Sequence, residues 1–262
     1  ALHGSAGARK QRNNVLMERW KERVYATYTH TAPTSTPVCA APGHERQLYL
    51  RRYGSFLPRD LAAPILDIGC GTGGFLDALR SVGYSCVEGV DLSASQVQTA
   101  AARGLTDITH APALDYLRTR SNRYATISAF SVLEHHTRAE LFDLLDAVRE
   151  ALQPGGCLIA VVPNAKGLFG AQVRFADITH ELSFTPTSVA QLCAVVGLDA
   201  PVVREHGPIV HGVPSAIRWT CWQAIRAGLL FARIAEGADW RWRVFTQDLV
   251  FIARKPVGAP TV

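Results

Sequence analysis

Hydrophobic and polar residues follow two alternating patterns through the middle of the chain. Five short apolar runs have the length and composition of buried strands: residues 64–69, 85–91, 106–111, 124–130 and 157–163. Between them lie stretches whose apolar residues recur with helical spacing: 75–83, 93–104 and 139–153. A last strand-like run covers residues 248–256. This alternation predicts an α/β fold, in which a parallel sheet carries helices on both faces.

The regions on either side of this pattern are less regular. Residues 17–30 have a mixed helical pattern, and prolines and a glycine interrupt it at 29–44, before a second predicted helix at 45–54. After Asn164 the periodicity is lost until a predicted helix at 187–198. We therefore expect an N-terminal helical cap and a main domain that carries an insertion rich in Trp and Arg: residues 17–60, 61–262 and about 209–245, respectively.

The first 16 residues differ in character from the rest of the chain. They contain three basic residues and no acid, and they end just before Met17, which is the only methionine. We expect residues 1–16 to be an upstream leader or residues left from cloning, outside the fold. Without these three charges the formal net charge falls from +5 to +2.

The chain carries no sign of a nucleic-acid substrate. No N/D-P-P-Y/F tetrapeptide, a motif of enzymes that flip a base, follows the fourth predicted strand, so we expect no nucleic-acid partner.

The cysteines and the hydropathy of the chain indicate where such a protein resides. Six cysteines are scattered without C-x-x-C pairs, which favours reduced thiols over a disulfide framework or a zinc site. No apolar run approaches the roughly 18 residues that span a bilayer, and no secretory signal is visible. The expected location is the cytoplasm.

A glycine-rich segment follows the first predicted strand and opens a helix. Glycines at 69, 71 and 73 allow the backbone to turn sharply and allow a ligand to approach closely. The spacing fits both G-x-G-x-G and G-x-G-x-x-G, so by itself it does not distinguish one nucleotide cofactor from another. Asp91 ends the second strand about 20 residues beyond the loop, where a carboxylate can accept both hydroxyls of a ribose.

Four motifs occur in a fixed order: ILDIGCGTG, GVDLS, SVLEHH and LQPGG. This ordered set resembles the class I S-adenosylmethionine-dependent methyltransferases, over roughly residues 45–200 and the last strand. The resemblance implies a Rossmann-like fold with a seven-stranded, mostly parallel sheet, an antiparallel last strand and helices on both faces. It also implies S-adenosylmethionine as cofactor.

The resemblance assigns roles to residues along the carboxyl edge of the sheet. The methionine end of the cofactor would contact Asp67 and the loop residues Gly69, Cys70, Gly71 and Gly73. Asp91 would bind the ribose, and Leu92 would pack on adenine. Pro112 stands where many family members have an acid for the adenine amino group, so the backbone of Ala113 or Asp115 is the expected substitute. Phe130 and Ser131 would flank the sulfonium.

Two clusters of acids and histidines could handle the proton of an acceptor hydroxyl. A histidine has a suitable pKa, especially where a carboxylate fixes its tautomer. Glu134 and His135 follow the fourth strand, and His180 lies between Asp177 and Glu181 after the fifth. We interpret His180 as the base and Asp177 as the carboxylate that orients it, although both segments could equally serve turns and helix starts. Glu134 and His135 alone do not define a metal site, and we expect no metal.

The acceptor-binding residues are less constrained by the sequence. Asn164 and Lys166, in an expected loop at 163–172, together with Glu181 and Tyr28, are the candidates. Tyr28 belongs to the helix that could fold over the cofactor. The D-x-T-H-E segment followed by SFTP resembles a subgroup that acts in polysaccharide and glycolipid biosynthesis, which implies a sugar acceptor.

Residues 216–235 form an amphipathic pattern in which arginines and tryptophans interleave. Three interpretations remain open: a core or homodimer interface, a wall of the acceptor site, or a basic helix on an anionic membrane surface.

The sequence thus predicts an O-methyltransferase that acts on a small molecule. The leading acceptor is a hydroxyl of a surface-polysaccharide sugar or of a nucleotide-linked or lipid-linked precursor. O- or C-methylation of a quinone or another aromatic metabolite is the first alternative. A non-catalytic cofactor-binding partner in a biosynthetic complex is the second.

Overall fold

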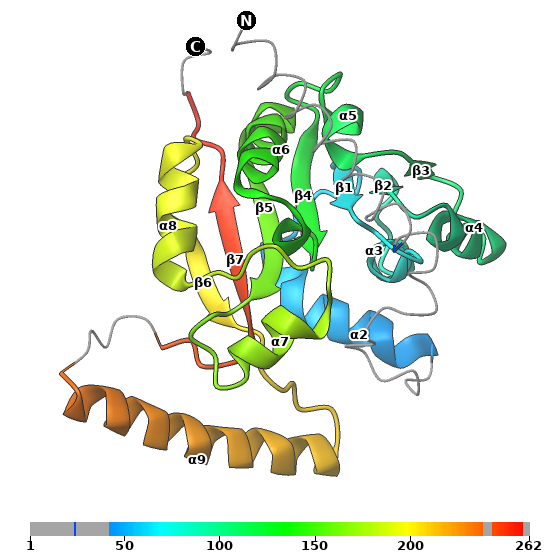
Figure 1. Ribbon diagram of the computed structural model, residues 1–262. Coiled ribbons are helices and arrows are strands. Elements are labelled where there is room, and N and C mark those ends of the chain that lie inside the picture. The colour runs from blue at the N-terminus through cyan, green and yellow to red at the C-terminus, as the bar shows by residue number, and fades with distance from the viewer. Residues whose placement is uncertain (1–23, 25–41, 238–242, 259–262) are drawn as a thin grey trace, which may run out of the picture.

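The computed structural model describes residues 24, 42–237 and 243–258 (Figure 1). Its centre is a seven-stranded sheet with the strand order β3-β2-β1-β4-β5-β7-β6. The strands are β1 (Ile65–Ile68), β2 (Val87–Asp91), β3 (Ile108–His110), β4 (Tyr124–Phe130), β5 (Leu152–Pro163), β6 (Val202–Glu205) and β7 (Asp248–Arg254). β7 is antiparallel to both of its neighbours, β5 and β6, whereas the pairs among β1 to β5 are parallel. The predicted mostly parallel sheet with an antiparallel last strand is confirmed.

Helices cover both faces of this sheet. They are α2 (Pro42–Tyr53), α3 (Gly74–Ser81), α4 (Ala94–Ala102), α5 (Ala113–Leu117), α6 (Arg138–Ala151), α7 (Gly170–Ala176), α8 (Pro186–Val195) and α9 (Val213–Ala235), with 3-10 turns η1 (Gly54–Phe56) and η2 (Leu133–His135). One core packs α5, α6 and α8 against the sheet, and the other packs α2 and α3 against its opposite face. β1 and the last part of β5 are continuously buried because both of their faces are covered.

Helix starts follow local sequence signals. Thr137 begins α6 with a capping box in which it accepts from the Glu140 amide, while the Glu140 side chain accepts from the Thr137 amide. Thr185 caps α8 in the same way with Ser188.

The irregular regions of the sequence contain more structure than the pattern predicted. α2 begins at Pro42, inside the expected loop, because proline is tolerated in the first turn of a helix. α7 begins inside the loop expected at 163–172, and its seven residues are too few to show a clear period. β6 has four residues at the edge of the sheet, where burial on one side leaves only a weak pattern.

α9 lies beyond the edge of the sheet to which the parallel strands point (Figure 1). All of its residues are described, and Ser215 is the only buried one among them. No helix in the described part of the chain combines the length and apolar character needed to cross a bilayer. Residues 1–16 and most of the expected cap at 17–60 lie outside the described residues, but α2 belongs to that cap and packs against α3.

Candidate active site

The glycine loop between β1 and α3 has the conformation that its sequence predicts. Gly69, Gly71 and Gly73 all have positive φ angles, of 65°, 56° and 77°. Residues other than glycine rarely adopt these backbone angles. A Cβ on residue 69 would also overlap Val132, so both the backbone angle and the lack of space require glycine there.

Asp91 joins this loop to the end of β2. Its Oδ2 accepts a hydrogen bond of 2.8 Å from the Gly71 amide, and its Oδ1 accepts one of 2.7 Å from the Ser93 amide. Burial raises the pKa of the Asp91 carboxyl, while these two amides act in the opposite direction. The carboxylate is therefore held beside the loop at the position from which a ribose would be bound.

Asp67 lies at the end of β1 and is almost completely buried. Ser128 on β4 donates a hydrogen bond of 2.6 Å to its Oδ1. Burial raises the pKa of Asp67 to about 7, because the ionised carboxylate is poorly solvated there. Cys70, in the loop itself, is also buried, and burial raises the pKa of its thiol.

The glycine cradle, the Asp91 carboxylate and the buried Asp67 together fit a ribose-containing cofactor with an amino-acid end. Leu92 follows Asp91 and is 47% exposed, which leaves its side chain free to pack on a base. Ala113 begins α5, with Pro112 as the helix cap. Leu92 and Ala113 are the residues expected to contact the adenine of the cofactor, and both contacts remain predictions.

Phe130 at the end of β4 belongs to an aromatic cluster. Its ring stacks on Tyr53 with a centroid distance of 4.5 Å and meets Phe75 edge-on at 4.9 Å. Tyr49 lies 6.0 Å away on the same side. The contacts of Phe130 in the structure are thus with α2 and α3, and any contact with a sulfonium is still a prediction.

A cavity of about 520 Å³ opens next to this cluster at the carboxyl edge of the sheet. Ser131, with a positive φ of 54°, lies in its wall. Four predicted catalytic residues line it, namely Glu134, His135, Asp177 and His180. The structure therefore brings together two segments that are more than 40 residues apart in the sequence.

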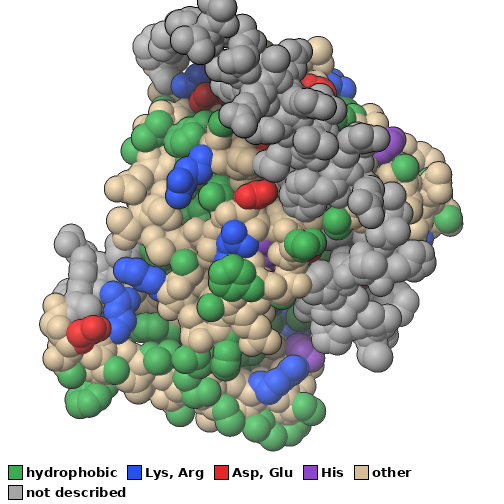
Figure 2. Space-filling view, in the orientation of Figure 1, with side chains coloured by type: hydrophobic (Ala, Val, Ile, Leu, Met, Phe, Trp, Pro, Cys, Tyr) green, Lys and Arg blue, Asp and Glu red, His purple; other side chains and the backbone are tan. Residues whose placement is uncertain are grey.

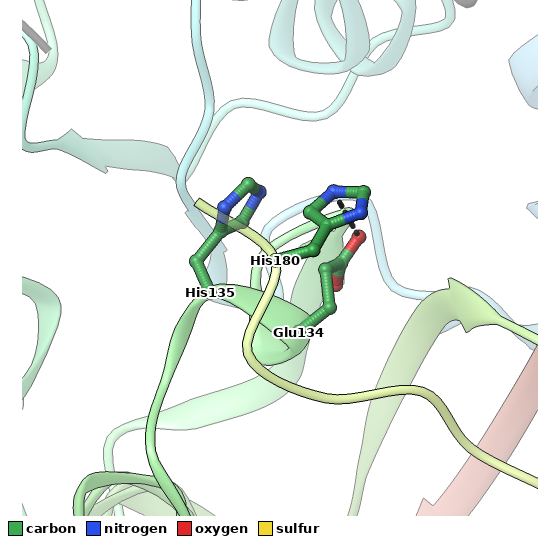
Figure 3. A group of neighbouring side chains, drawn as sticks. All are labelled: Glu134, His135 and His180. Atoms are coloured by element: carbon green, nitrogen blue, oxygen red, sulfur yellow. Dashed lines mark ion pairs between the residues drawn. The ribbon is translucent and has the colours of Figure 1, made fainter. Parts of the chain in front are cut away.

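Glu134, His135 and His180 form the centre of this group (Figure 3). The imidazole rings of the two histidines lie 4.8 Å apart, edge to face. His180 Nε2 lies 4.0 Å from Glu134 Oε1. The backbone fixes this arrangement, because the Glu134 carbonyl accepts hydrogen bonds of 2.7 and 3.0 Å from the amides of Glu181 and Leu182.

Hydrogen bonds assign the tautomers of both histidines. The Thr179 hydroxyl donates to Asp177 Oδ1 at 2.6 Å, so its oxygen accepts from His135 Nδ1 at 2.7 Å. His180 Nδ1 lies 3.0 Å from the carbonyl oxygen of Val173, which can only accept. In the neutral form of each ring, the proton is therefore on Nδ1 and the lone pair is on Nε2.

Burial favours the neutral forms of these imidazoles. It lowers the pKa of His135 to about 4, with the neighbouring His180 acting in the same direction. Burial also lowers the pKa of His180. For Glu134, burial raises the pKa to about 8.

The partner of Asp177 differs from the one predicted from the sequence. The sequence led us to pair Asp177 with His180, whereas in the structure Asp177 is linked through Thr179 to His135.

Several predicted acceptor contacts do not reach the cavity. Asn164 is fully buried, and its amide group donates to the carbonyls of Val244 and Thr246, while its Oδ1 accepts from Lys166 N. It therefore stabilises the chain before β7, and the expected contact with an acceptor is wrong. Lys166 is exposed, and neither it nor Glu181 lines the cavity. Tyr28 lies outside the described residues.

Other residues of the cavity wall were not among those predicted from the sequence. Tyr49 and Arg52 come from α2, and His206, Gln247 and Asp248 come from the end of β6 and the start of β7. The antiparallel direction of β7 brings its first residue to the edge where the parallel strands end. An antiparallel last strand was already expected, so that expectation could have indicated Asp248.

Comparison with known proteins decides the family. Residues 43–203, more than half of the chain, match the family described as "Methyltransferase domain". The chain belongs to the class I S-adenosylmethionine-dependent methyltransferases. None of the curated proteins matches it.

Solved structures share the fold of this methyltransferase at low sequence identity. A SAM-dependent methyltransferase from Archaeoglobus fulgidus has a TM-score of 0.61 at 19% identity, and the match covers 82% of this chain and 95% of that one. A putative methyltransferase in complex with the Haloferax volcanii Trm112 activator has a TM-score of 0.62 at 17% identity, with 83% and 92% covered. Phosphoethanolamine N-methyltransferase 2 of Haemonchus contortus, in complex with S-adenosyl-L-methionine, has a TM-score of 0.56 at 19% identity, with 81% and 52% covered. S-adenosylmethionine is the cofactor of this methyltransferase, and the residues of the glycine loop fit it.

Proposed function

We propose that this methyltransferase methylates a hydroxyl of a small polar acceptor, with a sugar of a surface polysaccharide, or of its nucleotide-linked or lipid-linked precursor, as the leading candidate. The observation that carries the proposal is the orientation of His180. Its Nδ1 donates to the Val173 carbonyl, and the lone pair on Nε2 belongs to the side of the ring that lies near Glu134. An unprotonated imidazole nitrogen in a cavity at this edge of the sheet is suited to accept a hydroxyl proton.

This arrangement assigns separate roles to the cofactor, His180 and the cavity walls. The bound cofactor supplies an electrophilic methyl group on its sulfonium. His180 takes the proton as the hydroxyl oxygen forms its bond to the methyl carbon. A positioned base of this kind contributes about 10²- to 10⁴-fold to the rate. The cavity walls hold the acceptor, because positioning near the methyl group provides much of the remaining acceleration.

Several groups in the cavity lining suit a polar acceptor. Nearly half of the residues that line it have charged or imidazole side chains. Arg52 donates to the Gly207 carbonyl through Nη2, while its buried Nη1 has no hydrogen-bond partner among the described residues. An acceptor hydroxyl could satisfy this donor, whereas an apolar ring would leave it unpaired.

The acceptor class can be tested with a labelled methyl group. The full chain would be incubated with methyl-labelled cofactor and with nucleotide-linked sugars, lipid-linked sugars or quinols in parallel. We expect label in a sugar product and an O-methyl group on analysis of that product. Label in the quinol alone would contradict the proposal. Release of demethylated cofactor without any methylated acceptor would instead favour a non-catalytic cofactor-binding role.

We propose further that α9 places the enzyme on an anionic membrane surface. With 3.6 residues per turn, Val213, Ile217, Ala224 and Phe231 lie along one line of the helix. Three of them have large exposed side chains: Val213 is 75%, Ile217 60% and Phe231 73% exposed. Figure 2 shows hydrophobic side chains along the lower edge of the molecule, where α9 lies.

Charge favours a lipid surface as the occupant of this helix face. α7 and α9 together contain four arginines and neither Asp nor Glu. The three arginines of α9 lie on the face opposite this line, and basic residues on the polar face of an amphipathic helix attract anionic headgroups. One of them, Arg226, is also paired with Glu205 at 3.2 Å. Trp219, 44% exposed, suits the interface between lipid and water. Phe175 on α7 is also highly exposed, and other residues of α7 line the cavity. A lipid surface in contact with both helices would bring a lipid-linked sugar close to the site.

Flotation with vesicles tests this surface. We expect the protein to float with vesicles that contain phosphatidylserine, less with phosphatidylcholine alone, and less at high salt. The double substitution Ile217→Ser and Phe231→Ser should lower the bound fraction about tenfold or more, because it removes two large apolar groups. Phe142→Ser, at an exposed phenylalanine on α6, is the matched control. A dimer in solution that the same double substitution disrupts, with no flotation, would contradict the proposal.

A further inference from the structure

Three metal-ligating groups meet in the cavity. Glu134 and His135 come from η2, and His180 comes from the turn after α7. One potential ligand atom from each lies within 4.8 Å of the other two (Figure 3). The sequence indicated only two ligands here and so led us to expect no metal; the structure adds the third.

The hydrogen bonds of both histidines are those of metal ligands. An imidazole that binds a metal usually donates its other N–H to a carbonyl or a carboxylate, which fixes the tautomer and the ring orientation. His180 donates to a carbonyl directly, and His135 donates through Thr179 to the Asp177 carboxylate. In this tautomer, Nε2 is the ring nitrogen through which each imidazole would bind a cation.

Glu134 provides an independent indication. Its side chain is 1% exposed, and its Oε2 has no hydrogen-bond partner among the described residues. A buried carboxylate oxygen without a partner is costly, and such groups in proteins are normally paired or bound to a metal. The cavity wall also carries Asp177 and Asp248, so the local charge favours a cation.

We propose that Glu134, His135 and His180 bind one divalent transition-metal ion. Two imidazoles and one carboxylate are typical of ions such as Fe²⁺, Co²⁺ or Zn²⁺ rather than of Mg²⁺ or Ca²⁺, which prefer oxygen ligands. Ligand bonds of about 2.0–2.2 Å place the atoms that share an ion about 3–4 Å apart. Small rotations of the three side chains from their present separation close that distance.

Such an ion would change how the acceptor hydroxyl loses its proton. His180 Nε2 would then serve as a ligand instead of the base. The bound ion would supply a Lewis acid that lowers the pKa of an acceptor hydroxyl, whose proton would pass to water. The inference deepens the proposed methyl transfer at the same cavity, but binding of the ion needs neither cofactor nor acceptor.

Titration of the metal-free full chain with Co²⁺ tests the binding directly. We expect one ion per chain by calorimetry, with a visible absorption band from the bound Co²⁺. Glu134→Gln and His180→Ala should each abolish this band. Thr179→Val keeps all three ligands but removes the hydrogen bond that orients His135, and it should weaken binding about 10- to 100-fold.

Two control variants separate this site from other binding. His136 is adjacent in sequence, but its Nδ1 bonds to the Val132 carbonyl, and His136→Ala should retain the Co²⁺ band. Cys221 is an exposed thiol, and Cys221→Ser should retain it as well. Absence of stoichiometric binding, or binding that survives both Glu134→Gln and His180→Ala in folded protein, would overturn the proposal.

Activity measurements keep the metal inference and the proposed function apart. If the ion binds and a chelator abolishes O-methylation, with recovery on re-addition, the metal site and the methylation of a hydroxyl both stand, with His180 as a ligand instead of the base. O-methylation that a chelator does not affect, in a chain that binds no Co²⁺, overturns the metal site and leaves His180 as the base. Binding of Co²⁺ without methylation of any hydroxyl acceptor overturns the proposed function alone.

Discussion

His180→Ala is expected to lower kcat by about 10²- to 10⁴-fold while the dissociation constant of S-adenosylmethionine changes less than about threefold. His180 lines the cavity but makes no contact with the glycine loop or Asp91 in the hydrogen bonds of the described residues. Its loss therefore removes the group that accepts the proton, or that binds the metal, without disturbing the cofactor site. Turnover with the identified acceptor and calorimetric binding of the cofactor are the two measurements.

A matched pair of variants separates chemistry from folding. His180→Asn retains an amide donor for the Val173 carbonyl but has no basic nitrogen, and it should lose turnover as His180→Ala does. His211→Ala, at an exposed histidine that does not line the cavity, should be unaffected. Melting temperatures close to that of the unsubstituted chain confirm that the variants are folded. Retained turnover in folded His180→Ala would remove this residue from the mechanism.

Asp91→Ala is expected to weaken S-adenosylmethionine binding by about 10²- to 10³-fold, because two hydrogen bonds to a charged group are lost at a cost of about 3–4 kcal/mol. The same carboxylate accepts from the amides of Gly71 and Ser93, so its removal also loosens the loop that contacts the cofactor. Calorimetric titration with S-adenosylmethionine measures the effect.

Two further substitutions define what Asp91 does. Asp91→Asn keeps the size of the side chain but removes its charge, and it should bind more weakly than the unsubstituted chain yet more tightly than Asp91→Ala. Asp146→Ala, at an exposed aspartate on α6, should bind normally. Binding by Asp91→Ala within threefold of normal would mean that the ribose is held elsewhere.

The sequence predicted the cofactor half of the molecule well because that half depends on contiguous signals. Continuous apolar runs gave the buried strands, and the glycine spacing gave a loop whose three glycines do have positive φ. Asp91 ends its strand as expected and contacts the loop. Each of these features is encoded within about 25 residues of sequence.

The acceptor half was predicted less well because it depends on contacts between distant segments. Asn164 is a polar residue of a type that often binds ligands. In the structure, however, its side-chain amide donates hydrogen bonds to main-chain carbonyls just before β7. The partnership of Asp177 with His135 runs through Thr179, and the sequence indicated only a local turn between Asp177 and Thr179. Tertiary packing decides such pairings, and hydrophobic periodicity does not report them.

The two main-chain hydrogen bonds at the Glu134 carbonyl bear on how such enzymes diversify. They align the η2 turn with the segment that carries His180 without using any side chain of the cluster. Substitutions at 134, 135 or 180 can therefore change the chemistry of the cavity while the two segments stay in register. Through this backbone clamp, one scaffold could acquire new acceptors by exchanging three side chains, with no need to evolve a new fold.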